Sequence, residues 1–87
     1  MTKNVAAYYA HDGIRCNAIC PGAVATAIGI GGEAHPEGVA KLMKAAALSP
    51  RVGEAREIAT VALFLASGDA SFVNGAALIA DGGWTAI

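Results

Sequence analysis

Apolar residues gather in five separated runs, and their spacing predicts three helices and two strands. In residues 2–11, Val5, Tyr8 and Tyr9 fall at the i, i+3 and i+4 positions of a helix. Gly13 would end this helix in a left-handed cap. We expect the two tyrosines to be packing residues rather than catalytic groups.

The second run, residues 14–20, is apolar and rich in branched side chains, which predicts a strand buried on both faces of a parallel sheet. Pro21 should end it, because proline cannot donate a ladder hydrogen bond. Gly22 and Ala23 then allow the backbone to approach a flat group closely, and Thr26 adds a hydroxyl. Ligands bind at the carboxyl ends of strands in open α/β sheets, so the run predicts either a ligand edge or an ordinary turn.

Two helices follow. Val39, Leu42, Met43 and Ala46 give a helical stripe after Pro36, and this helix should end before Pro50. A longer helix begins near Gly53, with two acidic residues at its positive end. Its apolar positions extend far round the helix, which predicts burial on more than one side; they are Ile58, Val61, Ala62, Leu63, Phe64 and Leu65.

The last run, residues 76–80, predicts a short strand between the turn at Asn74-Gly75 and a turn beginning at Asp81. A helical crossover connects it to the strand at Ile14, so the two strands should be parallel neighbours. The side chain of Asp81 is expected to form the turn, although it could instead bind a ligand. The predicted fold class is α/β, in the order helix-strand-helix-helix-strand.

Composition adds that this chain should need a partner. It has 87 residues, of which 55% are hydrophobic and only 15% are charged. A chain this short buries roughly 60–65% of its unfolded surface, and two strands alone are marginally stable. We therefore expect apolar faces that meet another subunit or the remainder of a larger fold.

Charge and cysteine content exclude several classes of protein. The net charge is −1 with no basic block, which argues against nucleic-acid binding. Cys16 and Cys20 would lie roughly 13 Å apart on one strand, too far for a disulfide, so we expect small buried thiols in a reducing compartment. No His/Cys cluster predicts a metal site, and neither a signal peptide nor a membrane span is predicted, so the expected location is cytoplasmic.

The glycines between Gly29 and Ala34 fit the Gly-x-Gly-x-x-Gly/Ala dinucleotide pattern by spacing alone. That pattern should open a helix and be followed, about 20 residues on, by an acidic residue ending a second strand. Here Pro36 interrupts, and Glu54 lies at a helix start, so we reject the match. His35 is expected to be a solvated loop residue. A phosphate-binding role for residues 29–32 in an independent ligand-binding domain stays as a weaker alternative.

Three stretches in order resemble the short-chain dehydrogenase/reductase family. Residues 13–22 with Thr26 are similar to its late strand and cofactor loop. Residues 51–59 with 63–67 look like its last long helix, and residues 71–75 with 81–84 look like its last strand and C-terminal turn. The resemblance implies that residues 1–87 are a single partial domain, the C-terminal part of a Rossmann-type doubly wound parallel sheet with two parallel strands.

The family transfers hydride between NAD or NADP and a small carbonyl or alcohol. It uses a glycine-rich phosphate loop, a serine, and a tyrosine whose pKa is lowered by a lysine four residues later. Here Tyr8 and Tyr9 are followed at that spacing by Asp12 and Gly13. The pair is absent, no catalytic residue is assigned, and residues 2–11 resemble the second half of the helix that carries it. We expect the chain to be inactive alone.

The resemblance also implies a nicotinamide side of the cofactor pocket. Pro21 and Gly22 would shape the loop against the ring, the backbone of Val24 would bond the carboxamide, and Thr26 would bond the carboxamide or a phosphate oxygen. Without the phosphate loop, the chain should bind a dinucleotide weakly or not at all.

Residues 27–49 resemble the family's substrate lid, and the last helix and strand resemble its subunit-pairing surface. The expected partners are the N-terminal part of the enzyme or further copies in a homo-oligomer. The alternative is a non-catalytic oligomerisation or interaction module derived from the same fold.

Overall fold

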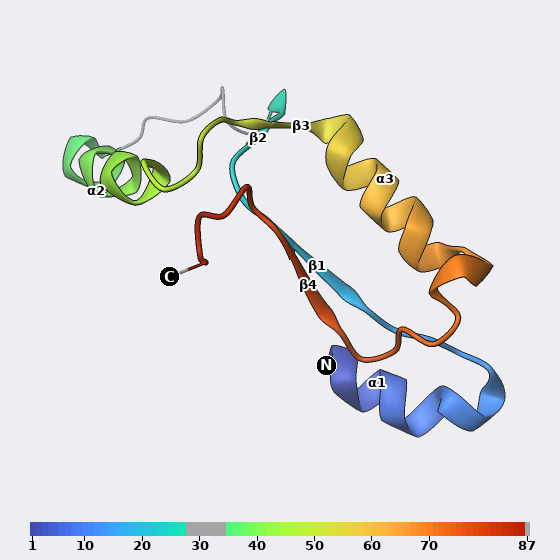
Figure 1. Cartoon of the computed structure of the whole chain (residues 1–87). Coiled ribbons are helices and arrows are strands. Elements are labelled where there is room, and N and C mark those ends of the chain that lie inside the picture. Colours follow the sequence, from blue (N-terminus) through green and yellow to red (C-terminus); the bar gives the residue numbers. More distant parts are fainter. Residues whose placement is uncertain (28–34, 87) are drawn as a thin grey trace.

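A computed structural model describes residues 1–27 and 35–86. In these segments the predicted helices and strands are present, with two further two-residue strands and two 3-10 turns (Figure 1). The elements in chain order are α1 (Thr2–Tyr9), η1 (Ala10–Asp12), β1 (Ala18–Pro21), β2 (Val24–Ala25), α2 (Pro36–Ala46), β3 (Gly53–Glu54), α3 (Ala55–Ala66), η3 (Gly68–Ala70) and β4 (Ala77–Ala80).

The strands β1 and β4 pair in parallel, with Ala18 opposite Ala77 and Pro21 opposite Ala80, as the sequence predicts. In Figure 1 the two strands run side by side, with α1 and α3 on different sides of the pair. The strand β1 begins later than predicted and includes Pro21. The N–H groups of Ala18 and Gly22 donate to β4. Because alternate residues bond to a given neighbour, the imide nitrogen of Pro21 faces away from β4, and no bond of this ladder is lost.

Residues 14–17 were predicted to be part of the strand, but hydrogen bonds to side chains take the place of the main-chain bonds of a regular ladder there. The Cys16 N–H donates to Asn74 Oδ1 over 2.9 Å, and the Ala76 N–H donates to Asn17 Oδ1 over 2.9 Å. The Gly75 N–H donates to the Cys16 carbonyl over 2.8 Å. The segment is therefore tied to the chain before β4 without being a strand.

The helix α1 is hydrogen-bonded to the same segment before β4. Asn74 Nδ2 donates to the Ala6 carbonyl over 3.2 Å, and a Cβ at Gly75 would lie 3.4 Å from the Ala6 Cβ, so the two segments are in contact. Gly13, at φ 76°, provides the predicted left-handed cap after η1.

The helix α3 begins with a capping box that the sequence only suggested through its acidic residues. The Glu54 side chain accepts the N–H of Glu57, and the Glu57 side chain accepts the N–H of Glu54. This exchange satisfies two of the donors that a helix N-terminus leaves open. Directly before it, β3 pairs in parallel with β2. The sequence did not predict this pair.

Burial is far lower than predicted. Within the described residues only Ala6, Leu65 and Ala70 are buried, whereas Tyr8 is 81% exposed and Leu63 is 71% exposed. The predictions that the tyrosines pack and that α3 is buried on more than one side are therefore wrong for this chain. The chain exposes 6799 Å², while a compact 8.7 kDa monomer exposes roughly 4,700 Å².

The β1–β4 pair has one covered face and one open face. Ile19 and Leu78 lie opposite each other and are half-buried, and Ile19 lines a hollow against α3. On the other face Cys20 and Ile79 are opposite each other and exposed. The predictions of a doubly buried strand and of a buried Cys20 are wrong here, because no described helix covers Cys20 and Ile79 on that face. Cys16 is half-buried, and both thiols are free.

In residues 1–27 and 35–86, no helix is both long enough and apolar enough to cross a bilayer.

Candidate functional site

Two loops meet at the carboxyl ends of β1 and β4, and Gly22 lies where they touch. A Cβ on Gly22 would lie 2.7 Å from the Cβ and 2.8 Å from the Cα of Asp81. Real Cβ atoms do not approach backbone so closely, so the contact requires glycine for steric reasons. The loop after β1 is thereby pressed against the turn after β4.

Asp81 builds that turn. Its Oδ1 accepts the Gly83 N–H over 2.9 Å, and its Oδ2 accepts both the N–H and the hydroxyl of Thr85, over 2.9 and 2.6 Å. These bonds, first of all that from the Thr85 hydroxyl, hold the pKa of Asp81 below its usual value. The predicted turn-forming role of Asp81 is confirmed.

The pair of β2 and β3 sets the direction of the Val24 backbone. Val24 is opposite Gly53, and the Gly53 N–H donates to the Ala23 carbonyl over 2.9 Å. In a parallel ladder only alternate residues of a strand bond to the same neighbour. The main-chain N–H and C=O of Val24 therefore face away from β3.

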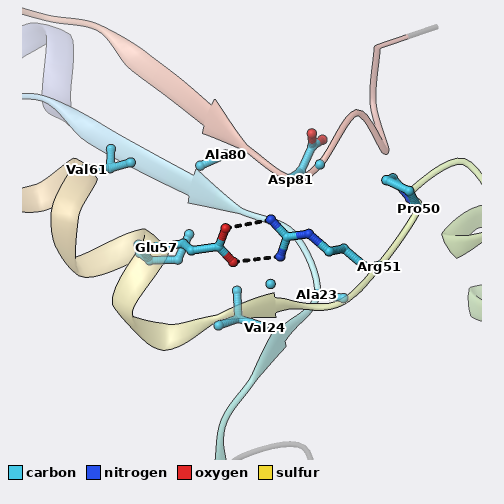
Figure 2. Close-up of a pocket in the computed structure, with 11 residues that line it drawn as sticks. Ala23, Val24, Pro50, Arg51, Glu57, Val61, Ala80 and Asp81 are labelled. Atoms are coloured by element: carbon cyan, nitrogen blue, oxygen red, sulfur yellow. Dashed lines mark hydrogen bonds and ion pairs between the residues drawn. The ribbon is translucent and has the colours of Figure 1, made fainter.

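An ion pair lies beside the strands β2 and β3. Arg51 donates through both terminal nitrogens to Glu57, at 2.8 and 2.6 Å, as the dashed lines in Figure 2 show. Glu57 also accepts the Glu54 N–H over 2.8 Å. The bond from Arg51, followed by that from Glu54, lowers the pKa of Glu57 to about 2. A carboxylate with this set of donors stays ionised at any physiological pH.

These segments enclose a cleft of about 260 Å³ whose walls come from β2, β3, the start of α3 and the end of β4 (Figure 2). The side chains and backbone that line it are Ala23, Val24, Pro50, Arg51, Gly53, Glu57, Ile58, Val61, Ala80, Asp81 and Gly82. A second hollow, of about 410 Å³, opens between β1 and α3 and includes Arg15 and Leu65.

All four residues expected to contact a cofactor lie at the carboxyl end of β1. Pro21 is the exposed last residue of the strand, Gly22 abuts Asp81, Val24 lines the cleft, and Thr26 is exposed after β2. Arg51 and Glu57 also lie at this edge and were not predicted from the sequence. The Glu-x-x-Glu spacing at the helix start was the available signal.

Two further expectations concern residues 29–35. His35 is exposed and lies at the N-cap of α2, which agrees with a loop role. The pattern at Gly29–Ala34, and with it the alternative phosphate loop, lies outside the described residues. Within the segments that are described, no three His, Cys, Asp or Glu side chains gather as metal ligands would.

Comparison with known proteins identifies the family. The family model described as Enoyl-(Acyl carrier protein) reductase matches residues 1–85. The chain is 52% identical over 87 residues to 3beta-hydroxysteroid dehydrogenase 2 of Eggerthella lenta, covering 99% of this chain and 34% of the relative. It is 42% identical over 88 residues to Dehydrogenase/reductase SDR family member 6 of Aquarana catesbeiana, covering 98% and 36%.

A solved structure leads to the same family as the sequence relatives. The crystal structure of a putative 2-deoxy-d-gluconate 3-dehydrogenase from Agrobacterium tumefaciens with bound NADP superposes with a TM-score of 0.82 and 36% identity, covering 99% of this chain and 35% of that one. The chain therefore belongs to the short-chain dehydrogenase/reductase family and has part of a Rossmann-like α/β fold. It spans about a third of the length of the relatives it matches.

Proposed function

We propose that residues 1–87 form the C-terminal, partial domain of an NAD- or NADP-dependent short-chain oxidoreductase and supply the nicotinamide side of its cofactor pocket. The observation that carries this is the parallel β1–β4 pair, whose carboxyl ends hold a loop in which β3 leaves the main-chain groups of Val24 unused. The placement at the C-terminal part rests on the order of the three family-like stretches and on the absence of a Tyr-x-x-x-Lys pair from the sequence.

The loop residues fit a flat amide ligand. The Val24 N–H and C=O can pair with the donor and acceptor of a nicotinamide carboxamide, because β3 does not use them. Pro21 and Gly22 bring the backbone close to the ring face, and the exposed Thr26 hydroxyl can bond the carboxamide or a phosphate oxygen. The bound cofactor would supply the hydride chemistry, and these residues would hold and orient it.

Other parts of the chain fit supporting roles. The region of α2 would cover a small carbonyl or alcohol substrate, since Leu42 and Met43 are exposed at 58% and 69%. The outer face of α3 with Leu63 and Phe64 would meet another subunit. The cytoplasmic location expected from the sequence stays a prediction.

A chimera tests this proposal. The third of the Eggerthella lenta relative that this chain matches is replaced by residues 1–87, and NADH and NADPH binding and turnover are measured. We expect the chimera to bind a dinucleotide and to catalyse oxidoreduction, and the isolated chain to do neither. A folded chimera that binds no dinucleotide, or turnover by the isolated chain, would contradict the proposal.

The second candidate is a non-catalytic assembly module, which the exposed apolar surface favours. Phe72 is fully exposed and Ile79 is 59% exposed, which is unusual for a chain that works alone. Light scattering on the purified chain tests this candidate. Stable dimers or larger oligomers that bind no dinucleotide would support it, whereas a monomer would eliminate it.

A further inference from the structure

The ion pair of Arg51 and Glu57 lies next to Ala23 and Val24, here called the Val24 loop, but neither residue belongs to that loop. The guanidinium meets the carboxylate through two parallel bonds of 2.8 and 2.6 Å. Such a fork fixes both the distance and the plane of the two groups, which a single contact does not. Both side chains are partly exposed, at 62% and 46%, so the pair contributes little to global stability and its geometry matters more.

The Glu57 carboxylate, held in this way by Arg51, also bonds to the main chain. Its Oε2, which accepts from Arg51, also accepts the N–H of Glu54, the second residue of β3. Glu54 in turn caps α3. Helix start, ion pair and β3 therefore form one connected unit, in which Arg51 closes the segment 51–57 into a loop.

The strand β3 is bonded directly to the Val24 loop. The Gly53 N–H donates to Ala23, and Val24 lies directly opposite Gly53. Figure 2 shows the ion pair on the inner wall of the cleft, between the start of α3 and the loop of Ala23 and Val24. The strands β2 and β3 have only two residues each, so their ladder is too short to hold its register unaided.

We propose that Arg51 and Glu57 are positioning residues for the cofactor loop: their bidentate pair holds β3 in place, and β3 holds the Val24 backbone in the direction that meets the nicotinamide amide. This inference rests on the proposed cofactor site. It adds that two residues which contact no cofactor set the affinity for it.

The test uses the chimera with Arg51→Lys and Glu57→Gln. Lysine keeps the charge but loses the fork, and glutamine keeps the shape but loses the charge. Matched controls are Arg56→Lys, one residue from Glu57 on the exposed surface of α3, and Asp69→Asn in η3. We expect the first two variants to raise the Kd and KM for NAD(P)H by about three- to tenfold, with kcat at saturating cofactor changed less than about twofold. The controls should leave all three constants unchanged.

Hydrogen exchange of the Gly53 amide gives a readout that needs no cofactor. It should accelerate at least about threefold in both variants and in neither control, since the bond to Ala23 opens more often. Unchanged exchange and unchanged KM would overturn the proposal. So would an equal loss in kcat with a lowered melting temperature, which indicates a purely structural role.

The two proposals fail in different ways. If the unsubstituted chimera folds but binds no dinucleotide, the proposed function is contradicted, while Gly53 exchange still decides whether the ion pair holds the loop. The same variants are made in a second chimera, built on the Aquarana catesbeiana relative, so that misfolding of one host does not decide the result.

Discussion

Gly22 and Gly53 both adjoin Ala23, Gly22 along the chain and Gly53 through its N–H bond to the Ala23 carbonyl, yet their surroundings differ. At Gly22 a Cβ would lie 2.7 Å from Asp81, whereas at Gly53 its nearest neighbours would be the Ala23 carbonyl and Glu57, both at an ordinary 3.6 Å. Gly22→Ala should therefore lower the free energy of unfolding of the chimera by about 1–3 kcal/mol through a forced backbone shift, while Gly53→Ala changes it by less than about 0.5 kcal/mol. Urea unfolding measures both. Equal effects at the two positions would show that the Asp81 contact is not tight.

Glu57 gives a pH prediction. Its pKa falls from 4.5 to about 2 in the folded chain, so its small stabilising effect is fully present above pH 4.5 and is lost as the pH falls toward 2. The difference in unfolding free energy between the chimera and its Glu57→Gln variant should be constant above about pH 5 and shrink below it. Unfolding curves at a series of pH values test this. A difference that changes between pH 6 and 8 would assign the ion pair to another titrating group.

Among single residues, the sequence predicted those whose role is local. Asp81 and Gly13 were identified because turn and cap chemistry depend on adjacent residues alone. The steric reason for Gly22 depends on how two separate segments meet, and it does not follow from spacing. Arg51 and Glu57 pair within one segment, where only the Glu-x-x-Glu spacing hinted at the role of Glu57.

At the scale of elements, Asn74 joins α1 to the start of β1. Its side chain accepts from Cys16 and donates to Ala6, so Asn74→Ala would leave two main-chain groups without these partners. We expect a loss of about 1–3 kcal/mol in unfolding free energy, against no more than about 0.5 kcal/mol for Asn4→Ala on the exposed side of α1. Chemical unfolding of the chimera measures both changes. A neutral Asn74→Ala would mean that water replaces both bonds.

The long elements were predictable and the short ones were not. The helices α2 and α3 and the parallel strands β1 and β4 follow from runs of apolar residues with a clear period. The two-residue strands β2 and β3 carry no period at all. The start of β1 was placed four residues early because Asn17 and Asn74 use side chains where the pattern suggested a ladder.

The open shape of the whole molecule explains why the burial of side chains was overestimated. The sequence pattern shows which faces are apolar, but it does not show whether this chain contains the segments that would cover those faces. The radius of gyration is 15.9 Å, while a compact domain of this length has about 12 Å. The open face with Cys20 and Ile79 and the outer side of α3 are apolar surfaces without cover in the described residues.

This openness predicts weak cooperativity for the isolated chain. With so few buried side chains, thermal unfolding of the 87-residue chain followed by circular dichroism should be broad, whereas the chimera should unfold in one sharp transition. A sharp transition in the isolated, monomeric chain would contradict the view that its fold depends on further chain.

The most direct measurement is a crystal structure of the chimera with bound NAD⁺ or NADP⁺. We expect the nicotinamide carboxamide to pair with the main-chain N–H and C=O of Val24, with Pro21 and Gly22 against the ring and the Arg51–Glu57 fork intact. A nicotinamide bound elsewhere, with the Val24 backbone unused, would contradict it.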